Sequence, residues 1–161
     1  MIEKDLEDRV IAAIRALSVS NLTVLGSWSM PEDETPETVA TLTVTVAPRS
    51  YSRFTVCEAT FSVSLDIDVS SAIDRDGAIF VAAAGAVSDL IHTWNMNRAN
   101  EAKIALSVDG ELAIGGIRAG AGGAPYLDRV AGRRTVSFNF EAIGFIAHTT
   151  NTNTNTNQQG E

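Results

Sequence analysis

Three acidic residues lie in a stretch of the sequence in which apolar and polar residues alternate. Asp66 and Asp68 stand two positions apart, and Glu58 occupies an even-numbered position of the same stretch. The three side chains therefore point to one face of an extended strand. Paired carboxylates can transfer protons or hold a divalent cation. No Asp-x-Asp-x-Asp-Gly loop accompanies them, and a solvated strand face is the commoner reason for such residues. We therefore predict no catalytic site and no metal site here.

A second candidate for chemistry is the glycine-rich segment 115–125, which holds five of the twelve glycines. A phosphate-binding G-x-G-x-x-G loop joins a strand to a helix, because the phosphate sits at the helix N-terminus. Here Pro125 stands where the third glycine belongs, and the residues that follow predict loop and strand. The sequence therefore predicts no cofactor site. We interpret the segment as a long, mobile connection between two strands.

The other residue types of catalytic sites are scarce. The single cysteine, Cys57, alternates with apolar neighbours, which predicts a buried and unreactive thiol. His92 and His148 fall in different elements without an accompanying motif, and the chain has neither a Gly-x-Ser-x-Gly nor a His-Glu-x-x-His pattern. We predict that the protein is not an enzyme.

Acidic residues outnumber basic ones by 20 to 12, which gives a net charge of −8. This balance argues against a protein that grips nucleic-acid phosphates. It is compatible with a surface that nucleic acid passes without adhering, because like charges repel. Arg129, Arg133 and Arg134 form the one basic cluster, suited either to pairing with carboxylates across an interface or to simple solvation.

Neither a membrane span nor a secretion signal is expected. The longest apolar run, near residues 78–87, is too short to cross a bilayer. Met1 leads into charged residues rather than into the apolar run of a signal peptide. We expect a protein that is made in the cytoplasm and has no membrane partner.

Periodicity predicts the elements that position these residues. Apolar residues at intervals of three or four predict helices over residues 2–17 and from Ile73 to Trp94, the second capped by Ser70 or Ser71 with Asp74 in its first turn. Alternation predicts strands, and a phase change predicts a bulge near Val56. The expected strands cover residues 22–28, 38–47, 57–69, 104–108, 111–118 and 134–147, with an exposed loop at 29–37 and a turn at 109–110.

The long strand at 57–69 has one apolar face and one acidic face, which indicates a sheet covered by helices on one side only. We therefore predict an α+β fold, with a mainly antiparallel sheet of about five or six strands and two helices packed on one face. Residues 1–148 are expected to form one domain. Residues 149–161, a Thr/Asn-rich tail without an apolar side chain, are expected to be disordered.

This order of elements resembles the tail terminator (tail completion) proteins of long-tailed bacteriophages and their relatives at the head-tail neck. The resemblance is carried by the leading helix, by the passage from strand 61–69 into helix 78–94, and by the ending at residues 133–145. It covers nearly the whole chain, through arrangement rather than through invariant residues. The Thr/Asn tail departs from the pattern.

The resemblance implies a structural virion protein that forms a ring, usually of six copies, at the head-proximal end of the tail tube. Such a ring stops tube polymerisation and joins the tail to the neck. Implied partners are further copies of the chain, the tail tube protein and the neck or connector proteins, with DNA passing through unbound. The location is the virion, after assembly in the host cytoplasm. The implied channel lining is Glu58, Asp66 and Asp68, and the implied interface is Gly120, Gly122, Gly123, Tyr126, Arg129, Arg133 and Arg134.

Two alternatives to the tail terminator remain open. One is another phage tail or neck subunit, such as a tail tube or connector protein. The other is a small α/β ligand-binding or enzymatic domain, which would place Asp66 and Asp68 in a deep pocket with raised pKa values.

Overall fold

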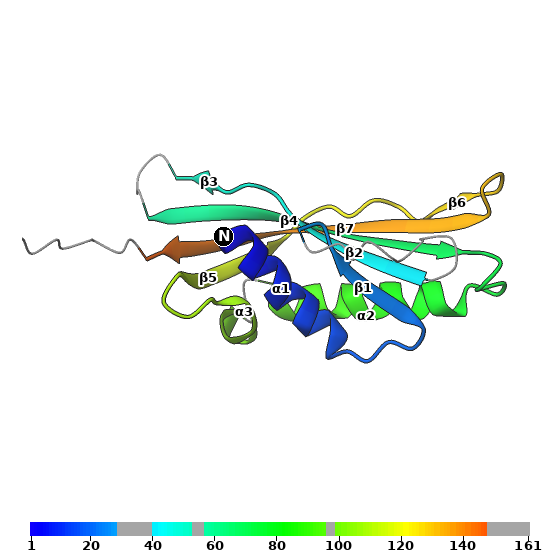
Figure 1. The fold of residues 1–161 in the computed structure, drawn as a ribbon, viewed down its shortest axis with the longest axis horizontal. Coiled ribbons are helices and arrows are strands. Elements are labelled where there is room, and N and C mark those ends of the chain that lie inside the picture. Colours follow the sequence, from blue (N-terminus) through cyan, green and yellow to red (C-terminus); the bar gives the residue numbers. More distant parts are fainter. Residues whose placement is uncertain (29–39, 53–56, 96–98, 148–161) are drawn as a thin grey trace, which may run out of the picture.

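The computed structural model describes residues 1–28, 40–52, 57–95 and 99–147. Three helices and seven strands build an α+β fold in which the helices lie on one side of the sheet (Figure 1). The prediction of this fold class is confirmed, with one more helix and at least one more strand than expected. The helices are α1 (Ile2–Arg15), α2 (Ala78–Trp94) and α3 (Ala99–Leu106); the strands are β1 (Leu22–Gly26), β2 (Ala40–Val46), β3 (Ser50–Tyr51), β4 (Glu58–Ser70), β5 (Leu112–Ala119), β6 (Tyr126–Asp128) and β7 (Arg133–Ile146).

The sheet has the order β1-β2-β4-β7-β5, with β3 also paired to β4 and β6 to β7. Its centre is the antiparallel pair of β4 and β7, which stay in register from Glu58 opposite Phe145 to Ser70 opposite Arg133. Only β1 and β2 pair in parallel among the described strands. Parallel neighbours need a long connection, and residues 27–39 provide it.

The helices cover the apolar face of the sheet. Alternate residues of β4, from Ala59 to Val69, are at most 1% exposed, as their alternation predicts. α1 contributes Leu6 and Val10 to this core, and α2 contributes Trp94, whose ring meets that of Phe140 edge to face at a centroid distance of 6.0 Å. Such pairs add to the stabilisation that burial alone provides.

Residues 104–108 were expected to form a strand, and that prediction is wrong. Residues 104–106 are the last turn of α3, whose sequence Ala-Asn-Glu-Ala-Lys-Ile-Ala-Leu is rich in helix-forming residues. Ala102 and Leu106, four positions apart, are both buried, whereas Ile104 is 82% exposed. The predicted turn nevertheless forms: Val108 bridges to Leu112, and Gly110 takes a positive φ of 74°.

The start of α2 and the state of Cys57 also differ from expectation. α2 begins at Ala78 after Gly77, so neither Ser70 nor Ser71 caps it, and Ile73 is exposed. Asp74 lies before the helix rather than in its first turn, yet its carboxylate accepts hydrogen bonds from the N–H groups of Ile79 and Phe80. Cys57 is exposed because it precedes β4 instead of belonging to it. The bulge predicted near Val56, the loop 29–37 and the tail 149–161 lie outside the described residues.

Candidate functional site

The face of the sheet opposite the helices, called the open face here, carries the three acidic residues singled out from the sequence. Glu58, Asp66 and Asp68 are each partly exposed, on alternate positions of β4. Ser62, between them, is exposed, and their neighbours on β7 in the same orientation include Ser137 and Asn139. The open face is therefore a polar surface rich in hydroxyl groups.

Asp66 is held by hydroxyl groups from two strands. The Ser64 hydroxyl donates to one carboxylate oxygen at 3.1 Å, and the Ser137 hydroxyl of β7 donates to the other. Both donors lie on the open face, so the carboxylate links β4 to β7 there. This arrangement fixes Asp66 without neutralising its charge.

Asp68 is paired with an arginine. The Arg133 Nε donates to Asp68 Oδ1 at 2.8 Å, across the β4–β7 pair, where Asp68 faces Thr135 and Arg133 is the diagonal neighbour. Arg118 and Glu141 form a second, more exposed pair on the same face at 3.4 Å. Along β4, β5 and β7 the open face thus carries four carboxylates and two guanidinium groups, a net charge of −2 (2 − 4).

A cavity of about 480 Å³ opens on this face, across β2, β4, β5 and β7. Its lining includes Thr45, Ser62, Arg118, Asn139 and Glu141, but neither Asp66 nor Asp68. The enzymatic alternative requires Asp66 and Asp68 to lie in a deep pocket, and both lie outside this one. Among the described residues no group of three or more His, Cys, Asp and Glu side chains is arranged to hold a metal ion.

The glycine-rich segment is attached to this chain's own sheet. Gly120 N–H donates to Asn139 O at 2.8 Å and Gly123 N–H to Ser137 O at 2.9 Å, so the backbone follows β7 from β5 to β6. A Cβ at Gly120 would lie 3.0 Å from Asn139 O, and one at Gly122 would lie 2.9 Å from Ser137 O. A side chain at either position would require the β7 backbone to shift, so glycine suits this close approach. The segment is the predicted connection between two strands, and its backbone lies along β7.

The segment leads into a strand that the sequence did not predict. β6 pairs with β7 through Tyr126 opposite Thr135, Leu127 opposite Arg134 and Asp128 opposite Arg133. The turn that follows is built by Asp128, whose Oδ1 accepts hydrogen bonds from the N–H groups of Val130 and Ala131 at 3.0 Å each. We call residues 126–132 the hairpin tip. The Asp-x-x-x-Gly spacing was the signal that could have revealed it.

The hairpin tip presents apolar side chains to solvent. Tyr126 is 64% exposed, Leu127 is 43% exposed and Val130 is fully exposed. Arg129 lies between them and is also exposed. Of the residues predicted as an interface, Tyr126 and Arg129 are therefore the two whose side chains reach outward from this tip.

Arg133 and Arg134 are less exposed than Tyr126 and Arg129, because both make contacts within the molecule. Arg133 pairs with Asp68, while Arg134 donates from Nη1 to the Asp74 carbonyl oxygen at 2.6 Å and from Nη2 to Arg75 O at 3.3 Å. Arg134 thus holds the start of β7 to the segment before α2, while Arg133 links β7 to β4 on the open face.

Asp74 is the centre of that contact. Burial of its carboxyl acts to raise the pKa, but the hydrogen bonds from the Phe80 and Ile79 N–H groups and the nearby Arg134 outweigh burial, so the pKa of Asp74 lies below its ordinary value. A carboxylate at this position also matches the positive end of the α2 dipole. The result is a junction between the start of β7 and the N-terminus of α2.

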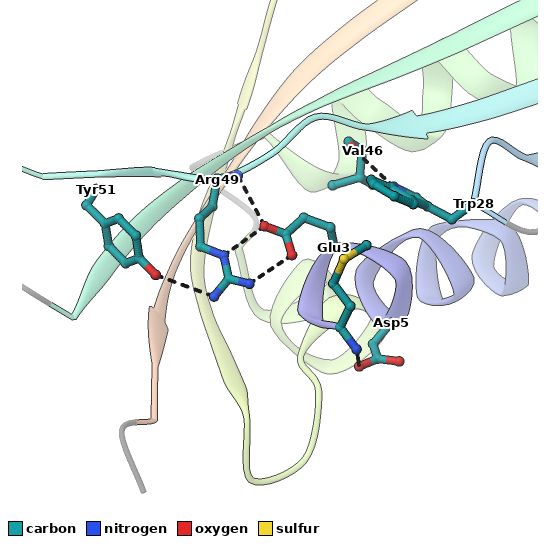
Figure 2. Close-up of polar contacts among 7 residues, drawn as sticks. Glu3, Asp5, Trp28, Val46, Arg49 and Tyr51 are labelled. Carbon is teal, nitrogen blue, oxygen red and sulfur yellow. Dashed lines mark hydrogen bonds and ion pairs between the residues drawn. The ribbon is translucent and has the colours of Figure 1, made fainter. Parts of the chain in front are cut away.

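A second junction joins α1 to the chain after β2 (Figure 2). Glu3 is buried and accepts from Arg49 Nε at 2.7 Å, from Arg49 Nη2 at 2.9 Å and from the Arg49 backbone N–H at 3.2 Å. Arg49 also donates to the Tyr51 hydroxyl at 3.4 Å. The bidentate hydrogen bond with Arg49 lowers the pKa of Glu3.

Glu7, one helical turn further, is completely buried, and no ion pair joins it to a basic residue of the described part of the chain. Its Oε1 accepts from the Trp28 N–H at 2.9 Å, and no hydrogen-bond partner among the described residues reaches its Oε2. Burial raises the pKa of Glu7. Trp28 itself is anchored by its indole N–H, which donates to Val46 O at 3.2 Å (Figure 2).

No protein-family model and no curated protein sequence matches the chain. Solved structures do match. A chain of the virion of a native gene transfer agent particle aligns over 89% of this chain and 91% of its own length, with a TM-score of 0.50 and 18% identity. A second structure, of a protein without a descriptive name, aligns over 91% and 94%, with a TM-score of 0.56 and 14% identity. At these identities the likeness shows a shared fold. In the described part of the chain, no helix has the length and apolar character needed to cross a membrane.

Proposed function

We propose that this chain is a structural subunit of a phage-like particle, and that it acts there as a tail terminator. In this role six copies form a ring at the head-proximal end of the tail tube, stop its polymerisation and join the tail to the neck. The observation that carries the proposal is the fold shared with a chain of a gene transfer agent virion, over nearly the full length of both chains. The element order that resembles tail terminators supports the finer assignment.

The open face supports a channel-lining role. A wall that DNA must pass needs to be polar and weakly repulsive, without clustered cations that would hold the phosphates. The hydroxyl groups of β4 and β7 and the net charge of −2 meet this requirement. Asp66 and Glu58 supply the negative charge, since Arg133 and Arg118 offset Asp68 and Glu141.

The hairpin tip supports a contact role. A loop that joins rigid subunits needs a defined backbone and outward side chains. Asp128, Gly120 and Gly122 define the backbone, and Tyr126 and Arg129 project from it. Within this proposal Gly123, Arg133 and Arg134 support the contact surface from inside the subunit.

Light scattering on the purified protein, combined with negative-stain microscopy, tests the assignment. A terminator should give discrete hexameric rings that do not stack. Long tubes would identify a tube subunit instead, and a strict monomer even in the presence of tube protein would contradict the ring. Particles assembled without this chain should carry tubes of irregular length and no attached heads; tubes of normal length would refute the terminator role.

A further inference from the structure

The described part of the molecule leaves the apolar side chains of the hairpin tip exposed. Tyr126, Leu127 and Val130 together expose apolar area at one end of the sheet, and Arg129 adds a positive charge. Exposed apolar side chains gathered at one place indicate a contact surface. The opposite end of the sheet holds a surface of matching character.

That surface is a groove of about 390 Å³ at the far end of β7. Its wall is largely apolar, and Phe145 within it is half exposed. Two exposed carboxylates, Asp109 and Glu111, stand among its lining residues. The apolar lining consists of Val108, Leu112, Ala113, Phe145, Ile146 and Ala147.

The distance between tip and groove excludes self-contact. β7 runs from Arg133 beside the tip to Ile146 beside the groove, which is about 40 Å at ~3.3 Å per residue. Figure 1 shows β6 at one end of the sheet and the beginning of β5 near the other. A groove at one end can therefore receive only the tip of another molecule.

We propose that the hairpin tip of one copy of this chain docks into the apolar groove of the next copy. Val130 and Leu127 enter the groove, and Arg129 lies against Asp109 and Glu111 at its rim. This contact deepens the proposed function and rests on it, since it names the two surfaces that join neighbouring subunits of the ring.

Charge and polarity favour the hairpin tip of a second copy as the occupant of the groove, over other parts of that copy and over the segment 149–161. The molecule carries a net charge of −8, so an acidic rim repels most of a second copy's surface and attracts its exposed arginine. The segment 149–161 contains no apolar residue, so its composition does not match an apolar wall. The contact joins two different surfaces, the tip of one copy and the groove of the next. It is therefore heterologous, the type of contact from which a six-membered ring is built.

Disulfide trapping between copies tests the contact. The background is Cys57→Ser, because Cys57 lies beside the groove, with its carbonyl oxygen accepting from Ile146 N–H at 2.8 Å. Val130→Cys protein and Ala113→Cys protein should form a disulfide-linked dimer when they are mixed under mild oxidation. Either protein alone should give little dimer. Equal cross-linking of Val130→Cys alone would mean tip-to-tip contact and overturn the proposal.

Charge reversal provides an independent measurement. Arg129→Glu and Glu111→Arg should each raise the concentration needed for half-assembly about tenfold, and the double variant should recover most of the loss. Arg9→Glu, on an exposed position of α1, is the matched control and should assemble normally. Unchanged assembly of the single variants, or failure of the double variant to recover, would contradict the contact.

The outcomes separate this contact from the ring assignment. Hexameric rings without the mixed disulfide would refute the contact and leave the terminator proposal intact. Open chains with the mixed disulfide would confirm the contact and refute the ring. A wild-type monomer at every concentration, with no mixed disulfide, would refute both.

Discussion

The junction between Glu3 and Arg49 should make a measurable contribution to the stability of the monomer. Glu3 is 5% exposed and receives three hydrogen bonds from Arg49, two of them from the guanidinium group. Arg49→Ala removes the two side-chain bonds and leaves a buried carboxylate without its cation. Hydrogen bonds to charged groups contribute about 1.5–3 kcal/mol each in net terms, and the partial exposure of Arg49 reduces the loss. We expect the free energy of unfolding to fall by about 2–3 kcal/mol.

Urea denaturation at several pH values measures this loss. Because the pKa of Glu3 is lowered in the folded state, the stabilisation is fully present above the unfolded pKa of a glutamate. It is lost as the pH falls through the folded pKa, where Glu3 becomes protonated. The gap between wild type and Arg49→Ala should therefore be constant near neutral pH and narrow in acid.

Lys4→Ala is the matched control, because the Lys4–Asp8 pair has a similar length of 2.8 Å but lies exposed on the same helix. The change that Lys4→Ala makes to the free energy of unfolding should be no larger than the experimental error. A double-mutant cycle with Glu3→Gln then isolates the coupling between the two side chains. A loss below about 0.5 kcal/mol, or a loss that does not change with pH, would refute the reasoning.

Three further predictions concern single residues. Gly122→Ala should lower the free energy of unfolding by about 1–3 kcal/mol because its Cβ would meet a backbone oxygen of β7 at 2.9 Å, whereas Gly123→Ala, with its nearest contact at 3.9 Å, should have little effect in the same urea titration. Glu7→Gln should gain stability relative to wild type as the pH rises. The raised pKa of Glu7 means that the fold favours its protonated form, so wild type loses stability as the pH climbs through that pKa. Parallel pH profiles of the free energy of unfolding for the two proteins would contradict this. Arg134→Ala should lower the melting temperature and speed hydrogen exchange in the segment before α2, since it removes donors to two carbonyl oxygens, while the exposed Arg129→Ala should leave the monomer's melting temperature unchanged.

The periodic patterns that extend over many residues predicted most of the fold. The alternation along β4 and β7 and the apolar repeats of α1 and α2 are each long enough to be distinctive, and all four elements form. Short elements gave weaker signals. Ile104 to Val108 alternates like a strand by chance, whereas the helix propensity of the preceding Ala-Asn-Glu-Ala-Lys was the better guide.

The polar junctions could not be predicted, because they depend on register. Glu3 and Arg49 lie 46 positions apart, and Arg133 and Asp68 lie 65 apart. Whether such residues meet is decided by how β4 pairs with β7 and how α1 lies on the sheet. The open-face carboxylates were located from alternation alone, but the arginines that offset two of them were not.

The central pairing of β4 with β7 also constrains how the chain can acquire its fold. Residues paired across it are separated by 63 to 87 positions in the sequence, from Ser70–Arg133 to Glu58–Phe145. Bringing together strands so far apart in the sequence costs conformational entropy before the hydrogen bonds and buried contacts between them can form. This cost slows folding. During translation one edge of β4 therefore lacks its hydrogen-bonding partner until β7 has been synthesised. The central pairing can therefore form only after most of the chain has been made, and we expect a chaperone that shields β4 to raise the yield of folded subunits.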